Sequence, residues 1–351
     1  MPRPVALGID REAGKPREGP EFSRLPDLPP ASPALARALL FPPPEETVML
    51  ERILVPLDGS ELAEGILGRL RPLLRRKDAE VLLARAVDVE TSLARTDRGP
   101  RLAAERAKSE SYLRAVELRL SGEGIRARGL VCEGPAEESL LAAASEHGAD
   151  LIAMTTHGRS GIARWVFGSV TEKILRASPV PVLVVRAFGP GGAAPAAKDE
   201  IPFRRILLPT DGSEASEATI PAVVEFARLF GAEVVVLHVA VGAAVPVGAF
   251  AGSMIDPAPL PAFPPEDMAI SEEIPKKVAA TVAREGVRAS ALHLKGDAAS
   301  QIVDLCGSQR IDLVAMATHG RSGVGRWVLG SVTEKVVRSA PVPVLVIRSG
   351  R

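Results

Sequence analysis

The residues Thr-Thr-His-Gly-Arg-Ser-Gly-Ile-Ala-Arg-Trp-Val-Phe-Gly-Ser-Val-Thr-Glu-Lys (155–173), with Pro-Val-Pro-Val-Leu-Val-Val-Arg (179–186) after them, decide how this chain folds. They recur almost unchanged as Thr-His-Gly-Arg-Ser-Gly-Val-Gly-Arg-Trp-Val-Leu-Gly-Ser-Val-Thr-Glu-Lys (318–335) and Pro-Val-Pro-Val-Leu-Val-Ile-Arg (341–348). A repeat of this length predicts two copies of one structural unit.

Each copy predicts a loop that binds an anion. The loop follows an apolar run that predicts a strand (150–155 and 312–317) and leads into a helix that begins near Ser169 or Ser331. Glycines let a backbone approach a ligand, and the free N–H groups of a helix N-terminus attract negative charge. The glycines and arginines of the two loops are Gly158, Arg159, Gly161, Arg164 and Gly168, and Gly320, Arg321, Gly323, Arg326 and Gly330. We therefore predict phosphate binding in each copy.

The alternative interpretation is a purely structural loop. Ser169 with Glu172, and Ser331 with Glu334, fit the Ser-x-x-Glu capping box. A capping box signals only that a helix begins. The repeated glycines and arginines favour the phosphate interpretation over this one.

Length and charge narrow the class of protein. A chain of 351 residues suggests about two domains. Its 43 basic and 43 acidic side chains balance, which argues against a nucleic-acid partner, since that requires a basic face. Cys132 and Cys306 stand alone in apolar surroundings and are expected to be buried thiols in a reducing compartment, the cytoplasm. His147, His238 and His293 show no partner pattern and are expected to be structural.

Composition divides the chain into four parts. Residues 1–48 are rich in proline and lack the apolar segment of a signal peptide, so we predict a disordered extension, with Met49 as a candidate start of the native protein. Residues 49–187 and 204–351 are the two predicted domains, and 188–203 form a Gly, Ala and Pro-rich linker.

Within each domain, apolar strands alternate with helices. In the first domain we expect strands at 52–58, 80–87, 125–132, 150–155 and 182–186, with helices between them. Strands that are apolar on both faces predict a parallel sheet covered by helices on both sides, that is, an α/β fold of two doubly wound five-stranded sheets. Such sheets bind ligands at the carboxyl ends of the strands, where the strand order reverses.

The first strands confirm the duplication and add a polar residue to each candidate site. Arg-Ile-Leu-Val-Pro-Leu-Asp-Gly-Ser-Glu (52–61) matches Arg-Ile-Leu-Leu-Pro-Thr-Asp-Gly-Ser-Glu (205–214). Asp58 and Asp211 thus lie at carboxyl ends and are expected to share a cleft with the glycine loops, although an Asp before Gly-Ser is also a common turn residue.

Two further stretches have specific consequences. The last strands are apolar and would be exposed at a bare sheet edge, so we expect the two domains to pair through them as a pseudo-dimer. Residues 234–255 are almost uncharged, but proline and several glycines make them weakly hydrophobic. We predict a strand followed by a loop there and no membrane partner.

With these residues in view, the chain resembles the universal stress protein family, as a tandem two-domain member. The resemblance rests on the Asp at the end of the first strand and on a Gly-x2-Gly-x9-Gly-[Ser/Thr] loop. Its second and third glycines are Gly158 and Gly168, and Gly320 and Gly330, whereas the first glycine position holds Thr155 and Ala317. The resemblance implies a Rossmann-like fold, similar to adenine nucleotide α-hydrolases.

The resemblance also implies one ATP site in each domain, with Mg²⁺ as a further candidate ligand. In the first domain the implied residues are Pro56, Asp58, Ala86, Met154, Thr155, His157, Gly158, Arg159, Gly161, Gly168, Ser169, Val170 and Thr171. In the second they are Pro209, Asp211, Val239, Met316, Ala317, His319, Gly320, Arg321, Gly323, Gly330, Ser331, Val332 and Thr333. The aspartates would face the nucleoside, and the loop and helix start would hold the phosphates.

The resulting hypothesis is a cytoplasmic ATP-binding stress-response regulator, a nucleotide sensor with at most slow hydrolysis. No Gly-x4-Gly-Lys-[Ser/Thr] loop, no nucleophile with its base and no metal-ligand spacing is evident in the sequence, so we predict neither an efficient enzyme nor a protein-only metal site. Two alternatives stay open. One is a nucleotide-free interaction module that regulates a protein partner, which Thr155 and Ala317 favour, and the other is an enzyme that releases AMP or pyrophosphate. A further homodimer is also open.

Overall fold

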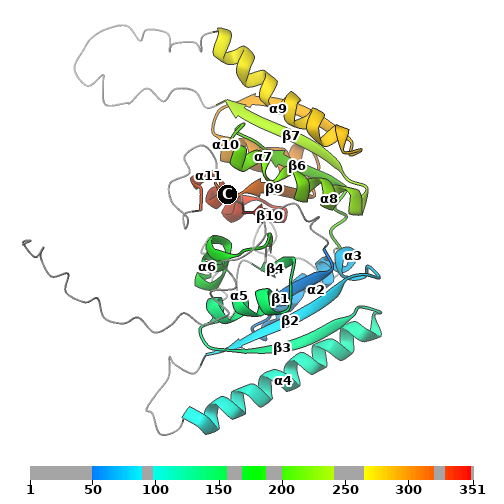
Figure 1. Cartoon of the computed structure of the whole chain (residues 1–351), viewed down its shortest axis with the longest axis vertical. Coiled ribbons are helices and arrows are strands. Elements are labelled where there is room, and N and C mark those ends of the chain that lie inside the picture. The colour runs from blue at the N-terminus through cyan, green and yellow to red at the C-terminus, as the bar shows by residue number, and fades with distance from the viewer. Residues whose placement is uncertain are drawn as a thin grey trace, which may run out of the picture.

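The computed structural model describes residues 50–88, 98–155, 168–186, 200–240, 265–319 and 329–348. Figure 1 shows two α/β halves, one above the other, that meet near the last strand of each.

The elements of the two halves follow the same order. Those of the first half are β1 (Arg52–Pro56), α2 (Glu61–Arg69), α3 (Arg71–Leu74), β2 (Glu80–Val87), α4 (Arg98–Gly122), β3 (Ala127–Glu133), α5 (Ala136–Glu146), β4 (Leu151–Thr155), α6 (Ser169–Ala177) and β5 (Val182–Val185). Those of the second half are β6 (Arg205–Pro209), α7 (Glu214–Glu217), α8 (Ile220–Phe230), β7 (Glu233–Ala240), α9 (Pro265–Arg284), β8 (Ala289–Lys295), α10 (Ala298–Ser308), β9 (Leu313–Ala317), α11 (Ser331–Ser339) and β10 (Val344–Ile347).

The ten strands form one sheet in the order β3-β2-β1-β4-β5-β10-β9-β6-β7-β8. Within each half all pairs are parallel, and the two halves join through the antiparallel pair β5–β10, in which Leu183 lies opposite Leu345. The predicted α/β fold with its parallel five-stranded sheets is thus confirmed, and so is the pairing of the halves through their last strands. Strand order reverses between β1 and β4, and again between β6 and β9.

Two apolar layers hold the helices on the sheet. Ile53 and Val55 of β1 point to one face, where they join a cluster with α2, α3, α4, α8 and α9. Leu54 points to the other face and joins a cluster with α5, α6, α10 and α11. Alternation along a strand buried on both faces produces this arrangement.

Several predicted element boundaries were wrong; the first strand, for example, ends at Pro56 and not at Asp58. The helix expected after Ser60 is divided into α2 and α3 because Pro72, near the start of α3, lacks the N–H group that would continue the hydrogen-bond ladder. The third strand begins at Ala127 and not at Ile125, although Ile125 is buried in the core. Of 234–255, residues 234–240 belong to β7 as expected, and 241–255 lie outside the described part. None of the described helices is long and apolar enough to cross a membrane.

An aromatic cluster stabilises the entry into the second half. Phe203 is fully buried, with ring centroids 5.2 Å from Phe226 and 4.9 Å from Phe230. Its backbone has φ 48°, a conformation that favours glycine. Packing of the ring therefore outweighs the backbone strain at this position.

We expect Phe203→Ala to lower the free energy of unfolding by about 3–5 kcal/mol, because it leaves a cavity between two rings. Urea unfolding followed by circular dichroism measures this loss. Leu118→Ala, at a side chain that is 67% exposed on α4, is the control. Equal losses in the two variants would contradict the packing role of Phe203.

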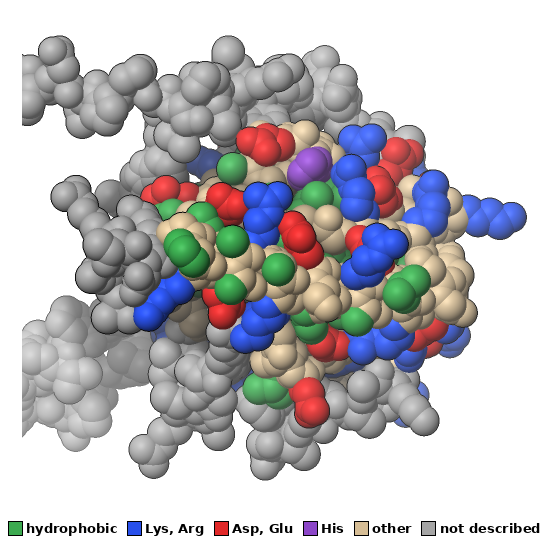
Figure 2. All heavy atoms as spheres, turned by 90° about the horizontal axis from the view of Figure 1, so that it is seen from below, with side chains coloured by type: hydrophobic (Ala, Val, Ile, Leu, Met, Phe, Trp, Pro, Cys, Tyr) green, Lys and Arg blue, Asp and Glu red, His purple; other side chains and the backbone are tan. Residues whose placement is uncertain are grey.

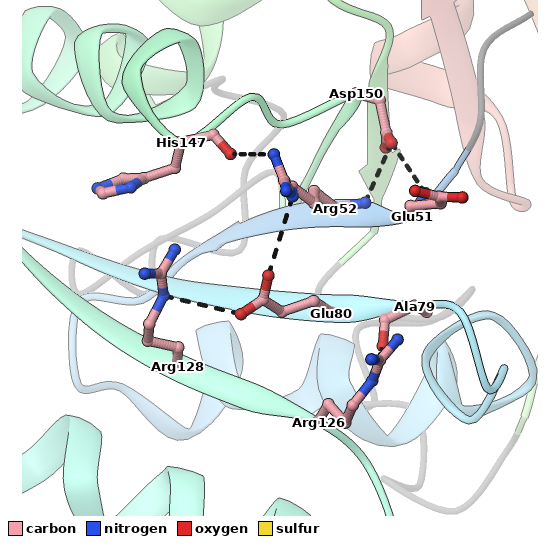
Figure 3. Close-up of polar contacts among 8 residues, drawn as sticks. All are labelled: Glu51, Arg52, Ala79, Glu80, Arg126, Arg128, His147 and Asp150. Carbon is pink, nitrogen blue, oxygen red and sulfur yellow. Dashed lines mark hydrogen bonds and ion pairs between the residues drawn. The ribbon is translucent and has the colours of Figure 1, made fainter.

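The amino ends of the strands carry a repeated carboxylate bridge. Asp150 Oδ2 accepts the N–H groups of Glu51 (2.8 Å) and Arg52 (3.0 Å), and Asp312 accepts those of Arg204 and Arg205 at the same distances. Figure 3 shows the first of these bridges beside the Glu80 carboxylate, which pairs with Arg52 and with Arg128 of β3. These contacts join β4, β1, β2 and β3 at the edge opposite to the predicted site.

Burial raises the pKa of Asp150 to about 6, although the N–H groups of Arg52 and Glu51 act to lower it. The folded protein therefore holds this proton more tightly than the unfolded chain does, and the associated stability is lost as pH rises from about 4 to about 6. The parent therefore loses this stability between pH 4.5 and 7.5, whereas Asp150→Asn does not. We expect the free energy of unfolding of Asp150→Asn, relative to that of the parent, to rise by about 1 kcal/mol over this range, allowing for solvent screening. Unfolding free energies at both pH values test this. Asp304→Asn, an exposed carboxylate on α10, is the control, and parallel pH curves for parent and Asp150→Asn would contradict the expectation.

Candidate functional site

Asp58 closes a tight turn after β1. Its Oδ1 atom accepts the backbone N–H of Ser60 (2.9 Å) and the Ser60 hydroxyl (2.6 Å), while Ser60 caps the N-terminus of α2. Gly59 between them has φ +85°, which explains why glycine stands there. The turn interpretation of Asp58 is thus realised, and the carboxylate lies, half-buried, at the carboxyl end of β1 beside β4.

The second half repeats this turn. Asp211 Oδ1 accepts the N–H of Ser213 (3.0 Å) and its hydroxyl (2.6 Å). Thr210 replaces the apolar Leu57 of the first half, and its hydroxyl accepts the N–H of Gly212 at 3.1 Å. The second turn therefore carries an additional internal hydrogen bond.

The helix after each glycine loop begins where β4 or β9 ends. The Thr171 hydroxyl donates to the Thr155 carbonyl (3.4 Å), and the Thr333 hydroxyl donates to the Ala317 carbonyl (2.9 Å). These bonds place the starts of α6 and α11 at the carboxyl ends of β4 and β9. In the sheet, β4 lies beside β1 and β9 beside β6, and β1 and β6 are the strands that lead into Asp58 and Asp211.

The predicted capping boxes are wrong. Ser169 and Ser331 are the first helical residues, and Gly168 and Gly330 occupy the N-cap position without a side-chain cap. A glycine cap leaves the first N–H groups of the helix available to a ligand or to water. The close backbone at Gly330 also disfavours a side chain, because a Cβ atom there would lie 3.1 Å from the Thr318 carbonyl oxygen.

The remaining described site residues lie around these two features. Met154 and Met316 are buried at the ends of β4 and β9. Ser169, Ser331 and Val332 are exposed on the first helical turns. Partly buried are Pro56, Pro209, Ala86, Val239 and Val170. The structure thus brings the strand-end residues and the helix starts of each half to one edge of the sheet. Outside the described residues lie His157, Gly158, Arg159, Gly161, Gly320, Arg321 and Gly323.

His319 has one satisfied and one unsatisfied ring nitrogen. Its Nδ1 atom lies 2.9 Å from the Thr318 hydroxyl, and its buried Nε2 atom has no hydrogen-bond partner among the described residues. Burial lowers the pKa of this imidazole, and Arg348 lowers it further. A neutral imidazole at this edge offers one nitrogen to a polar ligand.

Polar residues that the sequence did not predict as neighbours lie beneath the two turns. His238 and His293, for which no partner was expected, stack on each other with ring centroids 5.7 Å apart. Arg85 is only 6% exposed and packs on the ring of Tyr112. The signal was present in the strand positions, because His238 and His293 lie opposite each other in the β7–β8 register.

A groove of about 680 Å³ lies away from these turns, along β3 between α4 and α5. Its walls include Arg106, Glu117 and Glu146, and none of the predicted site residues lines it. Figure 2 shows the end of the molecule that carries α4 and β3, where acidic and basic side chains are mixed with scattered apolar ones. Cys132 lines the groove, and burial raises its pKa to about 11, which makes it a poor nucleophile.

The described residues contain no group of three or more His, Cys, Asp or Glu side chains that could hold a metal ion.

Comparison with known proteins gives a consistent family. The model of the universal stress protein family matches residues 49–186 and again residues 202–348. A universal stress protein of Methanocaldococcus jannaschii is 34% identical over 153 residues, which cover 42% of this chain and 82% of that protein.

Solved structures agree in fold. A universal stress protein from Archaeoglobus fulgidus covers 86% of this chain and 98% of its own, with a TM-score of 0.60 and 20% identity. A protein from Pseudomonas aeruginosa covers 86% of this chain and 94% of its own, with a TM-score of 0.56 and 16% identity. Because the family model matches both halves in sequence, the chain belongs to the universal stress protein family, as a member with two tandem copies of the family's unit.

Proposed function

We propose that each half binds one adenine nucleotide, with ATP as the leading candidate and Mg²⁺ as its accompanying ion. One feature carries this proposal. In both halves an Asp-Gly-Ser turn and a glycine-capped helix N-terminus stand on the two neighbouring strands where the strand order reverses. Such a crevice is where open α/β sheets bind ligands, and a helix N-terminus favours a phosphate.

Different residues would bind the nucleoside and the phosphates. The carboxylates of Asp58 and Asp211 would accept hydrogen bonds from the hydroxyl or amino groups of the nucleoside. The N–H groups at the starts of α6 and α11 would hold the phosphates, together with the exposed hydroxyls of Ser169 and Ser331. His319 Nε2 would add a polar contact in the second half.

The chain then acts as a cytoplasmic nucleotide-responsive stress regulator with at most slow hydrolysis. Nucleotide binding that favours one conformation of the chain over another would change the surface presented to a protein partner, which is how a sensor transmits occupancy. The second candidate function is a nucleotide-free interaction module, which Thr155 and Ala317 favour because they replace the first glycine of the family loop.

Equilibrium dialysis of the full chain with ATP, ADP, AMP and cAMP, with and without Mg²⁺, tests the proposal. We expect saturable ATP binding that approaches one nucleotide per half. A folded protein, checked by circular dichroism, that shows no saturable binding of any of these ligands up to millimolar concentration would overturn the proposal and leave the interaction module.

A further inference from the structure

The two halves differ in three side chains beneath the Asp-Gly turn. Arg85 and His238 are each the sixth residue of their strand, β2 and β7, and they point to the same side of the sheet. The neighbouring positions on the next strand and on the covering helix differ as well. The first half has Arg85, Tyr112 and Val131, where the second has His238, Ile274 and His293.

In the first half a buried cation supports the turn. A Cβ atom placed on Gly59 would lie 2.9 Å from Arg85 Nη1, so the guanidinium lies directly against the turn backbone. The Arg85 Cζ atom lies 5.0 Å from the centre of the Tyr112 ring. The Tyr112 hydroxyl donates to Glu64 Oε1 (2.9 Å), and Arg119 pairs with the same carboxylate. Because a guanidinium does not lose its proton in proteins, this support is the same at all ordinary pH values.

In the second half an imidazole takes this position and bonds to the turn itself. His238 is 7% exposed, and its Nδ1 atom lies 2.8 Å from the carbonyl oxygen of Thr210, the residue before Asp211. A carbonyl oxygen only accepts, so Nδ1 carries the proton and donates it. A Cβ atom on Gly212 would meet Ile274, at 3.2 Å, in place of a cation.

His238 is part of a stacked pair. The His293 ring lies parallel to it within 21°, and His293 Nε2 is 2.9 Å from the Ser271 hydroxyl on α9. The equivalent serine of the first half, Ser109, instead donates to the backbone carbonyl of Glu105. The serine hydroxyl is therefore used to hold an imidazole in the second half only.

We infer that the sixth residue of the second strand, Arg85 or His238, is the positioning residue for the Asp-Gly turn of its half, and that the exchange makes the second turn sensitive to pH while the first is not. The consequence for nucleotide binding rests on the proposed function. The response of the turn itself does not depend on it.

The physical reason is that the partly buried His293 imidazole, stacked on the buried His238 ring, resists protonation. Burial lowers the pKa of His293, the neighbouring His238 lowers it further, and Lys295 of β8 acts in the same direction, whereas Glu272 of α9 raises it. Asp211 is the carboxylate closest in sequence to the bonded Thr210. Since the folded protein binds a proton on His293 less readily than an exposed imidazole does, acid favours states in which the stacked pair is opened to water. Opening the pair withdraws His238 from the Thr210 carbonyl and loosens the turn.

Amide hydrogen exchange of the full chain by mass spectrometry, at pH 7.5 and 5.5 and corrected for the intrinsic exchange rate, tests this inference without any ligand. We expect opening of the peptide that contains Gly212 and Ser213 to increase about tenfold on acidification, because an exposed imidazole with a pKa of about 6.5 takes up its proton within this range whereas the closed one resists it. The peptide that contains Gly59 and Ser60 is the internal control and should not change. An equal acid response in the two peptides, or none in either, would overturn the inference.

Exchanging the side chains separates positioning from general stability. The triple variant His238→Arg, Ile274→Tyr, His293→Val carries the first-half set and should lose the acid response at Gly212. If it does not fold, His293→Val alone keeps the contact between His238 and Thr210 and should reduce the response. Persistence of the full response in either folded variant would contradict the inference.

ATP binding at the two pH values then links the turn to the site. In Asp58→Ala the second site is intact, and in Asp211→Ala the first site is intact. We expect the ATP affinity of the second site to fall about tenfold at pH 5.5 and that of the first site to stay unchanged. Absence of binding at both sites and both pH values would be a failure of the proposed function alone, since the exchange measurement still decides the inference. Equal weakening at both sites would contradict it.

Discussion

Leu345→Asp is expected to lower the free energy of unfolding by about 5 kcal/mol and to disrupt the junction of the two halves. Leu345 is 2% exposed and lies opposite the fully buried Leu183 in the antiparallel β5–β10 pair. The variant loses the apolar contacts of the leucine and buries a carboxylate without a partner. Because β5 and β10 lie in the middle of a ten-stranded sheet, water cannot reach the new charge without separating the strands.

Urea unfolding of the parent and the variant measures this effect. We expect one transition of the parent to become two in the variant, because the halves lose the interface that couples them. Leu118→Asp introduces the same charge at a side chain that is 67% exposed, and we expect it to cost less than about 0.5 kcal/mol. Equal costs for the two substitutions would mean that the halves do not join through β5 and β10.

Removing both turn aspartates is expected to weaken nucleotide binding at both sites. A hydrogen bond to a charged group contributes about 2 kcal/mol, so Asp58→Ala or Asp211→Ala alone should weaken ATP at its own site roughly 30-fold. The double variant should show no saturable binding at concentrations that fill the parent. Isothermal titration calorimetry measures both losses.

Two controls separate ligand contact from turn structure. Ser60→Ala with Ser213→Ala removes the hydroxyl that each aspartate accepts but leaves both carboxylates, and it should retain most of the affinity. Asp304→Ala removes an exposed carboxylate on α10 and should leave binding unchanged. Full affinity in the double aspartate variant would show that these carboxylates do not contact the nucleotide.

The position of the two Asp-Gly-Ser turns at the carboxyl ends of strands could be predicted from the sequence because its determinants are local. Asp58 and Asp211 follow strands whose apolar runs predict them, and parallel strands bring their carboxyl ends to one edge. The capping boxes were wrong for a reason that local pattern does not reveal. Gly168 and Gly330 occupy the N-cap positions, and Thr171 and Thr333 of the first helical turns bond to the distant strand ends Thr155 and Ala317.

The sequence by itself determined the duplication, the parallel α/β order within each half and the edge of the sheet at which the motifs meet. Hydrophobic periodicity, glycine spacing and sequence repeats are properties of neighbouring residues, so they can be recognised without knowledge of the fold. Only the tertiary structure decided that Phe203 fills an aromatic cluster against its backbone preference, and that His238 stacks on His293 where the other half has Arg85. These contacts join residues on different strands and helices, and their energies depend on burial, which arises only when the layers pack together.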